Sequence, residues 1–535
     1  MRDVMRKLLF LLVVFFFFRV IPLRANDIYI AQSATGAANG ADCADALAVT
    51  YFNTSGNWTS GIPAGTQIGP GTTVHLCGTF TGTAGQTLLT FQGSGASGNP
   101  VTLLFESGAN LTAPYWGSSG AIHVSGRSWV VIDGGTNGII QNTANGSGLA
   151  YMAQSNGLVL SGVSSVLVKN LAVANICEHT IGDTNTCQTG GNNSGGISVT
   201  GGATNLEITK TTVHDAYTCI WYGPSSSDTN VTISYNTLSR CNWEIAGNGG
   251  ASGPLTITGN DISCVVGGIC NYDDSNDNFH HNGIFFFPPN GASLSNMTIS
   301  NNHIHDINGH TTAYIFLAAN GSTGNVPNVL IYNNVFSTTS GQSGPANGMI
   351  TCGPSISGVK IYNNTMVGPG ARGFGADANA TMVNNIAEGQ AYVEYFDSGA
   401  SGNTSQYNDF YSWGQNGGWY NGATIFGALA SWQSGSTSQC SGGCDVIGSI
   451  TSNPNLGSAF VPASGSPAIG TGKNLSSLGI AGLNSGAPQY FGVNYACGNG
   501  CVPRSGTWDM GAYQTVSQSG GSQPNPPTNL KATVQ

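Results

Sequence analysis

Residues 231–238 read Val-Thr-Ile-Ser-Tyr-Asn-Thr-Leu, a short strand-like run that continues into Asn and a further apolar residue. The pattern returns along the middle of the chain, centred on Ile208, Ile233, Ile257, Ile299, Ile331, Ile361 and Met382. These centres are 25, 24, 42, 32, 30 and 21 residues apart. Short strands repeated at such intervals, with Gly, Asn and Ser turns, are typical of a parallel β-solenoid, in which each coil buries its apolar face against its neighbours.

The turn after each central residue has its own signal. Asn stands three residues later in five of the first six repeats, at Asn236, Asn260, Asn302, Asn334 and Asn364. An amide at one repeated turn position can hydrogen-bond to the equivalent amides in the coils above and below, so the sequence predicts an Asn ladder. A β-propeller is the competing architecture, but its blades are longer and carry four full strands, so the solenoid is favoured.

The composition limits the possible partners. Only 7% of the 535 residues are charged, 40% are hydrophobic and 79 are glycine. The glycines have no Gly-X-Y period, which excludes collagen, and the low charge argues against disorder and against a helical protein. Nucleic acids and anionic membranes are bound through clustered Lys and Arg, which this chain lacks. The expected partner is therefore neutral, unless a bound cation mediates contact with an acidic polymer.

The first 25 residues are predicted to be a secretory signal peptide. Arg2, Arg6 and Lys7 precede an apolar run at residues 8–18, and Ala25 supplies a small residue for cleavage. The run is short for a membrane-spanning helix, and an uncleaved anchor is the alternative. Cleavage would leave 9 basic and 23 acidic residues, a net charge of −14, in a secreted, extracellular protein.

The cysteines fit an oxidising compartment. All 13 lie after residue 25, and several are close in sequence, at positions 177 and 187, 264 and 270, 440 and 444, and 497 and 501. Such pairs are interpreted first as disulfides. Zinc is the alternative, but no pair has the two-residue spacing of a zinc knuckle with a partner pair nearby. The odd count leaves one cysteine over, and Cys352 is the most isolated candidate.

The coils of about residues 120–395, with their Ile-x-x-Asn-x-apolar pattern, resemble right-handed parallel β-helix proteins of the pectin-lyase-like superfamily. The motifs at 453–454, 466–470 and 508–513 are similar to the closing segment of many secreted bacterial β-helix proteins. The resemblance implies a right-handed parallel β-helix. It does not specify the chemistry, because this superfamily includes polysaccharide lyases, glycoside hydrolases, epimerases, phage tailspikes and non-enzymatic surface proteins. The Arg- and Lys-rich patterns of its best-known lyases and the Gly-His-Gly signature of its hydrolases do not occur here.

The expected organisation has five parts. They are a signal peptide at 1–25, an N-terminal cap and first coils at 26–120, a β-helix core at 121–395, C-terminal coils and a cap at 396–513, and a linker-like tail at 514–535. Per-coil insertions on one face of a solenoid usually carry the function.

One insertion stands out for its titratable residues. The step from Ile257 to Ile299 is 42 residues, against 24 for the step before it, and the excess contains Asp273, Asp274, Asp277, His280 and His281 within nine positions. A polar loop built from turn-forming residues is the alternative interpretation.

Aligned coils bring further groups together. When successive coils are aligned on their central residues, Ile208, Ile233, Ile257 and Ile299, His214 and His305 occupy equivalent positions in one column along the solenoid. The adjacent column then contains Asp215, Arg240, Cys264 and Asp306. Levelling Ile220, Ile245, Ile284 and Ile315 and applying strand alternation predicts five exposed side chains: Trp221, Glu244, Phe285, Tyr314 and Phe316. Aromatic rings beside carboxylates on an open face suit sugar rings, although aromatic residues are also ordinary strand formers.

Two mechanisms are compatible with these groups. Glycoside hydrolysis needs two carboxylates, which Glu244 with Asp277, or Asp277 with Asp306, would supply. In β-elimination, His280 or His281 would act as the base. Arg240, or a calcium ion bound by Asp273 and Asp274, would then neutralise the carboxylate of a uronate.

The sequence therefore favours a secreted enzyme that cleaves an extracellular, weakly charged polysaccharide or oligosaccharide. The candidate catalytic residues are Glu244, Asp277, His280, His281, His305 and Asp306. The candidate substrate-binding residues are Trp221, Arg240, Phe285, Tyr314 and Phe316, and the candidate metal ligands are Asp273 and Asp274. The alternative is a non-catalytic surface, adhesion or carbohydrate-binding β-helix, for which low charge and disulfides would provide durability.

Overall fold

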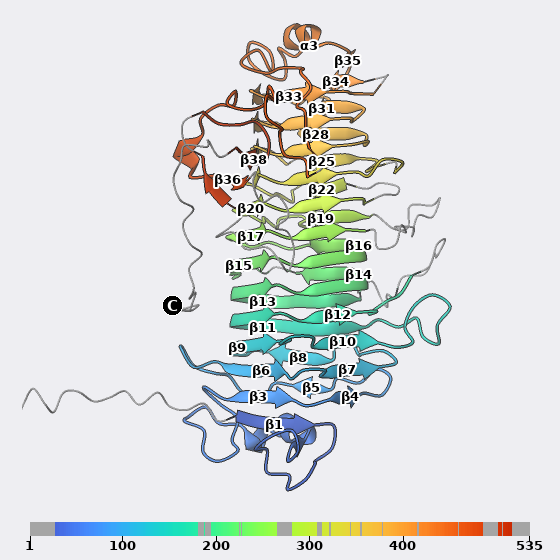
Figure 1. The fold of residues 1–535 in the computed structure, drawn as a ribbon, viewed down its shortest axis with the longest axis vertical. Coiled ribbons are helices and arrows are strands. Elements are labelled where there is room, and N and C mark those ends of the chain that lie inside the picture. Colours follow the sequence, from blue (N-terminus) through green and yellow to red (C-terminus); the bar gives the residue numbers. More distant parts are fainter. Residues whose placement is uncertain are drawn as a thin grey trace, which may run out of the picture.

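Each coil of the chain forms three short strands that pair in parallel with the equivalent strands of the coils before and after it. The computed structural model describes residues 27–179, 187, 194–223, 225, 227–264, 281–307, 313–319, 323–342, 344–353, 356–376, 378–414, 417–457, 459–484, 501–504 and 507–515. The coils build one tall column, with the first coils at the bottom and the last at the top (Figure 1). The predicted right-handed parallel β-helix is confirmed.

The strands form three stacks, named here in the order in which the chain visits them within a coil. Stack 1 contains β5 (Leu89–Thr90), β8 (Ile122–Ser125), the first halves of β11 (Asn156–Lys169) and β13 (Gly195–Thr209), the second halves of β14 (Thr212–Tyr222) and β16 (Thr237–Gly247), β19 (Asn282–Phe286), β22 (Ala313–Leu317), β25 (Gly348–Cys352), β28 (Arg372–Ala376), β31 (Tyr392–Phe396) and β34 (Gly418–Tyr420).

Stack 2 contains β1 (Asp27–Ala31), β3 (Thr73–Leu76), β6 (Val101–Phe105), β9 (Ser128–Asp133), the second halves of β11 and β13, β15 (Thr229–Ser234), β17 (Leu255–Thr258), β20 (Met297–Ser300), β23 (Leu330–Tyr332), β26 (Lys360–Tyr362), β29 (Thr381–Val383) and β32 (Thr404–Gln406). Stack 3 contains β4 (Thr79–Thr81), β7 (Asn110–Ala113), β10 (Ile139–Asn142), β12 (Ala172–Ala174), the first halves of β14 and β16, β18 (Asp261–Ser263), β21 (His303–His305), β24 (Val335–Ser337), β27 (Thr365–Val367), β30 (Ile386–Glu388) and β33 (Asp409–Tyr411).

The register follows the predicted repeat. In stack 2, the seven repeat centres from Ile208 to Met382 pair one with the next without a slip. All seven side chains are buried in the interior of the column. A one-residue slip would turn every apolar side chain outward, so the apolar repeat itself fixes the register.

The turn between stacks 2 and 3, called the ladder turn below, contains the predicted Asn ladder. Each of Asn236, Asn260, Asn302, Asn334, Asn364 and Asn385 donates its side-chain amide to the Oδ1 of the next ladder Asn at 2.9–3.1 Å, and the series ends at Asn408. The same Oδ1 atoms accept backbone N–H groups at 2.9–3.0 Å. The ladder thus satisfies buried backbone donors that the turn would otherwise leave unpaired.

The described parts of residues 453–515, namely 453–457, 459–484, 501–504 and 507–515, lie beside the ladder turn, where β36 (Ala481–Asn484) and β38 (Tyr513–Gln514) are next to the coils (Figure 1). Asn363 and Asn384 have positive φ, which Asn tolerates better than most residues, and their amides donate to the carbonyls of Asp509 and Lys473 at 3.0 and 2.8 Å. Buried Arg504 donates to Asn333 Oδ1 at 3.0 Å. β37 (Cys501–Pro503) completes a small three-stranded sheet with β36 and β38.

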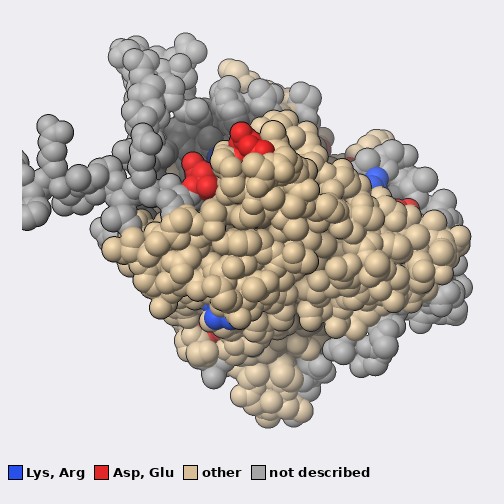
Figure 2. Space-filling model, turned by 90° about the horizontal axis from the view of Figure 1, so that it is seen from below, with Lys and Arg blue, Asp and Glu red and all other residues tan. Residues whose placement is uncertain are grey.

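Both ends of the column are covered. β2 (Leu47–Ala48), α2 (Thr50–Asn53) and the 3-10 turn at Ser55–Asn57 lie at the start, and β35 (Ile425–Phe426) and α3 (Leu429–Gly435) at the top (Figure 1); a second 3-10 turn spans Ser476–Leu478. Seen from the N-terminal end, the surface carries few charged side chains (Figure 2). None of the helices within the described residues is long and apolar enough to cross a membrane.

Disulfides join neighbouring coils and loops. The expected pairs Cys177–Cys187 and Cys440–Cys444 are confirmed, and the structure adds Cys43–Cys77 and Cys219–Cys241. Cys264 is also disulfide-bonded, whereas Cys270 and Cys497 of the other two predicted pairs lie outside the described residues. Disulfides of this kind agree with an oxidising compartment outside the cell.

Candidate functional site

The outer face of stack 1 brings together residues from successive coils. Ser198 pairs with Trp221, Trp221 with Ala246, Ala246 with Phe285, and Phe285 with Phe316. Ile220, Ile245, Ile284 and Ile315 form the level, buried row beside them, as predicted. The side chains of Trp221, Phe285 and Phe316 are partly exposed, which confirms their predicted placement on the outer face.

Two further rings join these three. Trp243 lies 5.3 Å from Phe285 and 6.4 Å from Trp221 between ring centroids, and Phe287 lies 4.4 Å from Phe285. Phe285 in turn stacks on Phe316 at 5.2 Å and 14°. Trp221, Trp243, Phe285, Phe287 and Phe316 are called the aromatic patch below. The sequence prediction missed Trp243 and Phe287, although the spacing of Phe285 and Phe287 by two residues was a usable signal for a shared face.

A cavity of about 460 Å³ opens beside the aromatic patch. Its lining combines three patch rings with polar and small side chains, namely Trp221, Trp243, Phe287, Ser118, Gln154, Asn156, Val159, Ser198, Thr200 and Asn248. The volume falls within the range of roughly 300–1,000 Å³ that is usual for small-molecule sites. None of these lining residues carries a charge, so the cavity offers rings and neutral hydrogen-bonding groups.

The polar side of the cavity is held by Asn156. Its Oδ1 accepts hydrogen bonds from the Ser198 hydroxyl and the Gly195 backbone N–H, both at 2.8 Å, and its Nδ2 donates to the Ser118 carbonyl at 2.7 Å. These bonds join three coils and fix the position of the amide at the cavity wall. A wall fixed in this way is preorganised for a ligand, because little rotamer freedom remains to be lost on binding.

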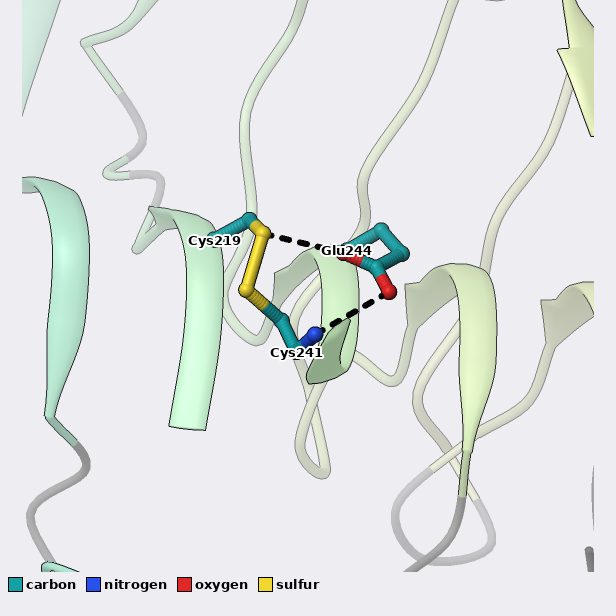
Figure 3. A group of neighbouring side chains, drawn as sticks. All are labelled: Cys219, Cys241 and Glu244. Carbon is teal, nitrogen blue, oxygen red and sulfur yellow. Dashed lines mark hydrogen bonds between the residues drawn. A yellow bond between two sulfur atoms is a disulfide. The ribbon is translucent and has the colours of Figure 1, made fainter. Parts of the chain in front are cut away.

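The expected exposure of Glu244 is wrong. Glu244 is 1% exposed and lies in the interior, where its Oε2 is 2.9 Å from Cys219 Sγ and its Oε1 accepts the Cys241 backbone N–H at 3.2 Å (Figure 3). Burial raises the pKa of this carboxyl well above its usual value. A protonated Glu244 can donate to the disulfide sulfur, which has no proton of its own. The side chain therefore does not reach a substrate on the outer face.

The expected exposure of Tyr314 is also wrong. Its ring is fully buried, and its hydroxyl donates to the Ser337 carbonyl at 3.0 Å. The chain bends where stack 3 passes into stack 1, called the insertion corner below, and residues just after the bend point inward instead of following strand alternation. Gly283 shows the direction, because a Cβ there would lie 2.8 Å from Ile304 Cγ2 in the core.

Arg240 is engaged within the protein. Its guanidinium donates to both carboxylate oxygens of Asp215, through Nε at 2.8 Å to Oδ1 and through Nη2 to Oδ2, and His214 lies 2.5 Å from the same carboxylate. Asp215 and Arg240 both adopt positive φ at the insertion corner, in the column predicted for them. Burial raises the pKa of Asp215, but its contacts with His214 and Arg240 outweigh this effect and leave the pKa below the usual value. An acidic ligand would have to compete with Asp215 for this guanidinium.

His305 and Asp306 lie on stack 3 and form a polar cluster there. His305 Nδ1 is 2.9 Å from Asp306 Oδ2, and Asp306 Oδ1 accepts the Thr339 backbone N–H at 2.6 Å. Burial lowers the pKa of His305, but the nearby carboxylates of Asp261 and Asp306 outweigh this effect and raise the pKa to about 9. Asp261 and His303, which the sequence prediction missed, complete this cluster. Their signal was the His-x-His spacing in a predicted strand, which places both rings on one face.

The remaining predicted site residues belong to the insertion. Asp273, Asp274, Asp277 and His280 lie outside the described residues, so their candidate roles in catalysis and calcium binding stay predictions. His281 is described and is fully buried just before β19.

Comparison with solved structures agrees with the fold. A crystal structure of pectate lyase Pel9A matches with a TM-score of 0.51 and 14% identity, over 92% of this chain and 97% of that chain. The surface protein and adhesin PfbA of Streptococcus pneumoniae has a TM-score of 0.39 at 11% identity, over 71% and 91% of the two chains. The GH136 lacto-N-biosidase from Eubacterium ramulus has a TM-score of 0.38 at 12% identity, over 79% and 67%.

No protein-family model and no curated protein matches the sequence. At 14% identity, the match to the pectate lyase shows a shared parallel β-helix fold alone. The function of this chain has to be argued from its own surface.

Proposed function

We propose that the protein binds a neutral oligosaccharide or polysaccharide in the cavity beside the aromatic patch. The observation that carries this proposal is the lining of that cavity, in which Trp221, Trp243 and Phe287 stand next to uncharged amide and hydroxyl groups. A binding site needs apolar surface for affinity and a few fixed polar groups for orientation, and this lining supplies both.

The chemistry of a sugar fits such a wall. The C–H face of a pyranose ring packs on an aromatic ring, while its hydroxyls exchange hydrogen bonds with amides and hydroxyls such as those of Asn156 and Ser198. Trp221 and Trp243 are inclined by only 26° to one another and present two such surfaces. Since none of the lining residues is Lys or Arg, the cavity offers no partner for a uronate carboxylate, which favours a neutral sugar over an acidic one.

Hydrolysis of the bound sugar is the second candidate function. It is favoured by the position of the acidic insertion, which leads directly into β19, the strand that carries Phe285 of the aromatic patch. The described cavity lining contains no carboxylate, so the two carboxylates that hydrolysis requires would have to come from the insertion, with Asp277 as the first candidate.

Binding can be tested with a panel of soluble polysaccharides. Neutral β-glucan, xyloglucan, galactomannan and arabinoxylan would be compared with polygalacturonate and alginate by affinity electrophoresis and calorimetry. Trp221→Ala and Trp243→Ala are each expected to weaken binding to a neutral polymer by about tenfold or more, because burying an aromatic side chain contributes about 1.5–3 kcal/mol.

The matched control is Trp129→Ala, which removes a partly exposed Trp of β9 on stack 2 and should leave the affinity unchanged. Equal binding by the wild type and both patch variants, or binding restricted to the acidic polymers, would contradict the proposal. The same panel, assayed for new reducing ends, tests hydrolysis. Asp277→Asn should lower any such activity by about 100-fold or more, the usual size of a general acid–base contribution.

A further inference from the structure

The outer face of stack 3 carries a group of side chains with metal-binding chemistry. His303 and His305 are separated by Ile304, whose side chain is fully buried, so both imidazoles project from the opposite face of β21. Asp261, on the preceding coil, is directly level with His303. Strand alternation and coil stacking thus bring together three ligands from two strands that are 42 residues apart.

The distances within this group are those between ligands of one metal ion. Asp261 Oδ1 lies 3.2 Å from His303 Nδ1 and 3.3 Å from His305 Nε2, and all three ligand atoms lie within 4.8 Å of one another. In a tetrahedral zinc site with bonds of about 2.0–2.1 Å, ligand atoms are about 3.3 Å apart. Asp261 Oδ1 is a buried oxygen that faces both imidazoles.

The far side of each imidazole is held by another group. Asp306 is a carboxylate that can only accept, so His305 Nδ1, at 2.9 Å from it, carries a proton. Loss of the other ring proton on metal binding would leave the lone pair of Nε2 facing Asp261. His303 Nε2 is 3.0 Å from the Ser337 hydroxyl, which can accept its proton and leave the lone pair on Nδ1. Metal-binding histidines are commonly oriented in this way by a carboxylate or another acceptor on their second nitrogen.

We propose that Asp261, His303 and His305 bind one divalent transition metal ion of the zinc class, with Asp306 and Ser337 as positioning residues. Asp261 Oδ1, His303 Nδ1 and His305 Nε2 can each offer a lone pair to one ion placed between them, with the ion taking the place of a ring proton. Two imidazole nitrogens and one carboxylate oxygen suit zinc and related ions, whereas calcium and magnesium prefer sites made of oxygen alone.

The site keeps one face toward solvent. The side chains of Asp261, His303 and His305 are 34%, 21% and 21% exposed, so an ion can enter and a water can complete its coordination. Three protein ligands with an open fourth position distinguish reactive zinc sites from closed, four-ligand structural ones. This site lies on stack 3 and the sugar cavity on stack 1, so the metal proposal does not rest on the proposed function.

Titration of the chelator-treated protein with zinc tests the proposal directly. Calorimetry should show one saturable site near neutral pH. The double variant His303→Ala/His305→Ala should lose it, and Asp306→Asn should weaken it by about 10–100-fold, the usual effect of removing a group that orients a metal-binding histidine. His123→Ala, which removes a partly exposed histidine from β8 on stack 1, should bind zinc like the wild type.

X-ray absorption spectroscopy of the zinc-loaded wild type supplies a measurement that needs no folded variant. It should show two imidazole ligands together with oxygen and no sulfur. A wild type that binds no zinc would overturn the proposal, and the cluster would then be held by a proton on His305. Unchanged binding in the folded double variant, or a spectrum with oxygen ligands alone, would also overturn it.

Discussion

The ladder turn and the insertion corner sit at opposite ends of stack 3, and they are built on different principles. At the ladder turn, coil after coil places the same residue in the same geometry, from Asn236 to Asn408. At the insertion corner, the first inward-facing residue after the bend differs between coils. In successive coils it is Gly196, Cys219, Glu244, Gly283 and Tyr314, and the loops that precede the bend vary in length. One turn therefore holds the column together through repetition, whereas the other is free to differ in every coil.

This contrast explains where the candidate sites lie. The candidate sugar-binding cavity lies on the outer face of stack 1, which follows the insertion corner, and the candidate metal ligands lie on neighbouring strands of stack 3, between the two turns. Substitution is expected to be tolerated poorly in the ladder. Each side-chain amide hydrogen-bonds to the coils on both sides, so a change in one coil removes bonds of its neighbours. Loops on a rigid scaffold are the usual place for function for the same reason.

The largest effect is expected from removing one rung of the Asn ladder. Asn334→Ala deletes an acceptor for the backbone and side chain of Asn302 and a donor to the Ile299 carbonyl, all at 2.9–3.0 Å and all buried. Each buried group left unsatisfied costs about 1–3 kcal/mol, so the free energy of unfolding should fall by about 3–5 kcal/mol. Denaturant titration followed by circular dichroism measures the loss. Asn99→Ala, at an exposed turn residue, is the control and should change stability by about 0.5 kcal/mol or less.

A smaller effect is expected at the insertion corner, where the row adapts from coil to coil. In Gly283→Ala the added Cβ would lie 2.6 Å from the Tyr314 carbonyl oxygen and 2.8 Å from Ile304 Cγ2, so the coil has to shift. Overpacking of this kind costs about 1–3 kcal/mol. Gly427→Ala, where a Cβ meets nothing within 4 Å, is the matched control. If Gly283→Ala were as damaging as the loss of a ladder rung, the proposed difference in tolerance between the two turns would be wrong.

The smallest expected effect concerns the pH dependence of Glu244. Its pKa is raised by burial, so the carboxyl favours folding fully only below its unfolded pKa of about 4.3, and this contribution is lost as the pH rises toward the folded pKa. Glu244→Gln removes the titration, so its stability relative to the wild type should increase from pH 5 to pH 8. Each pKa unit of the shift corresponds to about 1.4 kcal/mol.

Thermal unfolding of both proteins across this pH range measures the Glu244 effect. Glu207→Gln, on the partly exposed face of stack 2, should show a smaller increase, because its burial is incomplete. A difference between wild type and Glu244→Gln that did not change with pH would show that Glu244 is ionised inside the fold.

The repeated part of the molecule could be predicted from the sequence. Periodicity predicted the buried apolar centres from Ile208 to Met382, the Asn ladder, and the outward placement of Trp221, Phe285 and Phe316. It succeeded because each coil packs on its neighbours in the same way. The prediction failed for Glu244 and Tyr314, since strand alternation does not hold across the bend at the insertion corner. It also missed His303 and Asp261, which become neighbours only when the 42-residue step closes into a coil.

The spacing of apolar and Asn residues can be seen in the sequence alone, and it is sufficient for a parallel β-helix because burial and turn hydrogen bonds recur with each coil. Which polar side chains face solvent, and which face each other, depends on how the coils pack in the folded protein. Glu244 is buried against the Cys219–Cys241 disulfide, whereas the side chains of Asp261, His303 and His305 are partly exposed, although all of these are polar residues in short strands. The difference arises from the direction of the backbone at each bend, which depends on the packing of neighbouring coils and not on any local sequence pattern.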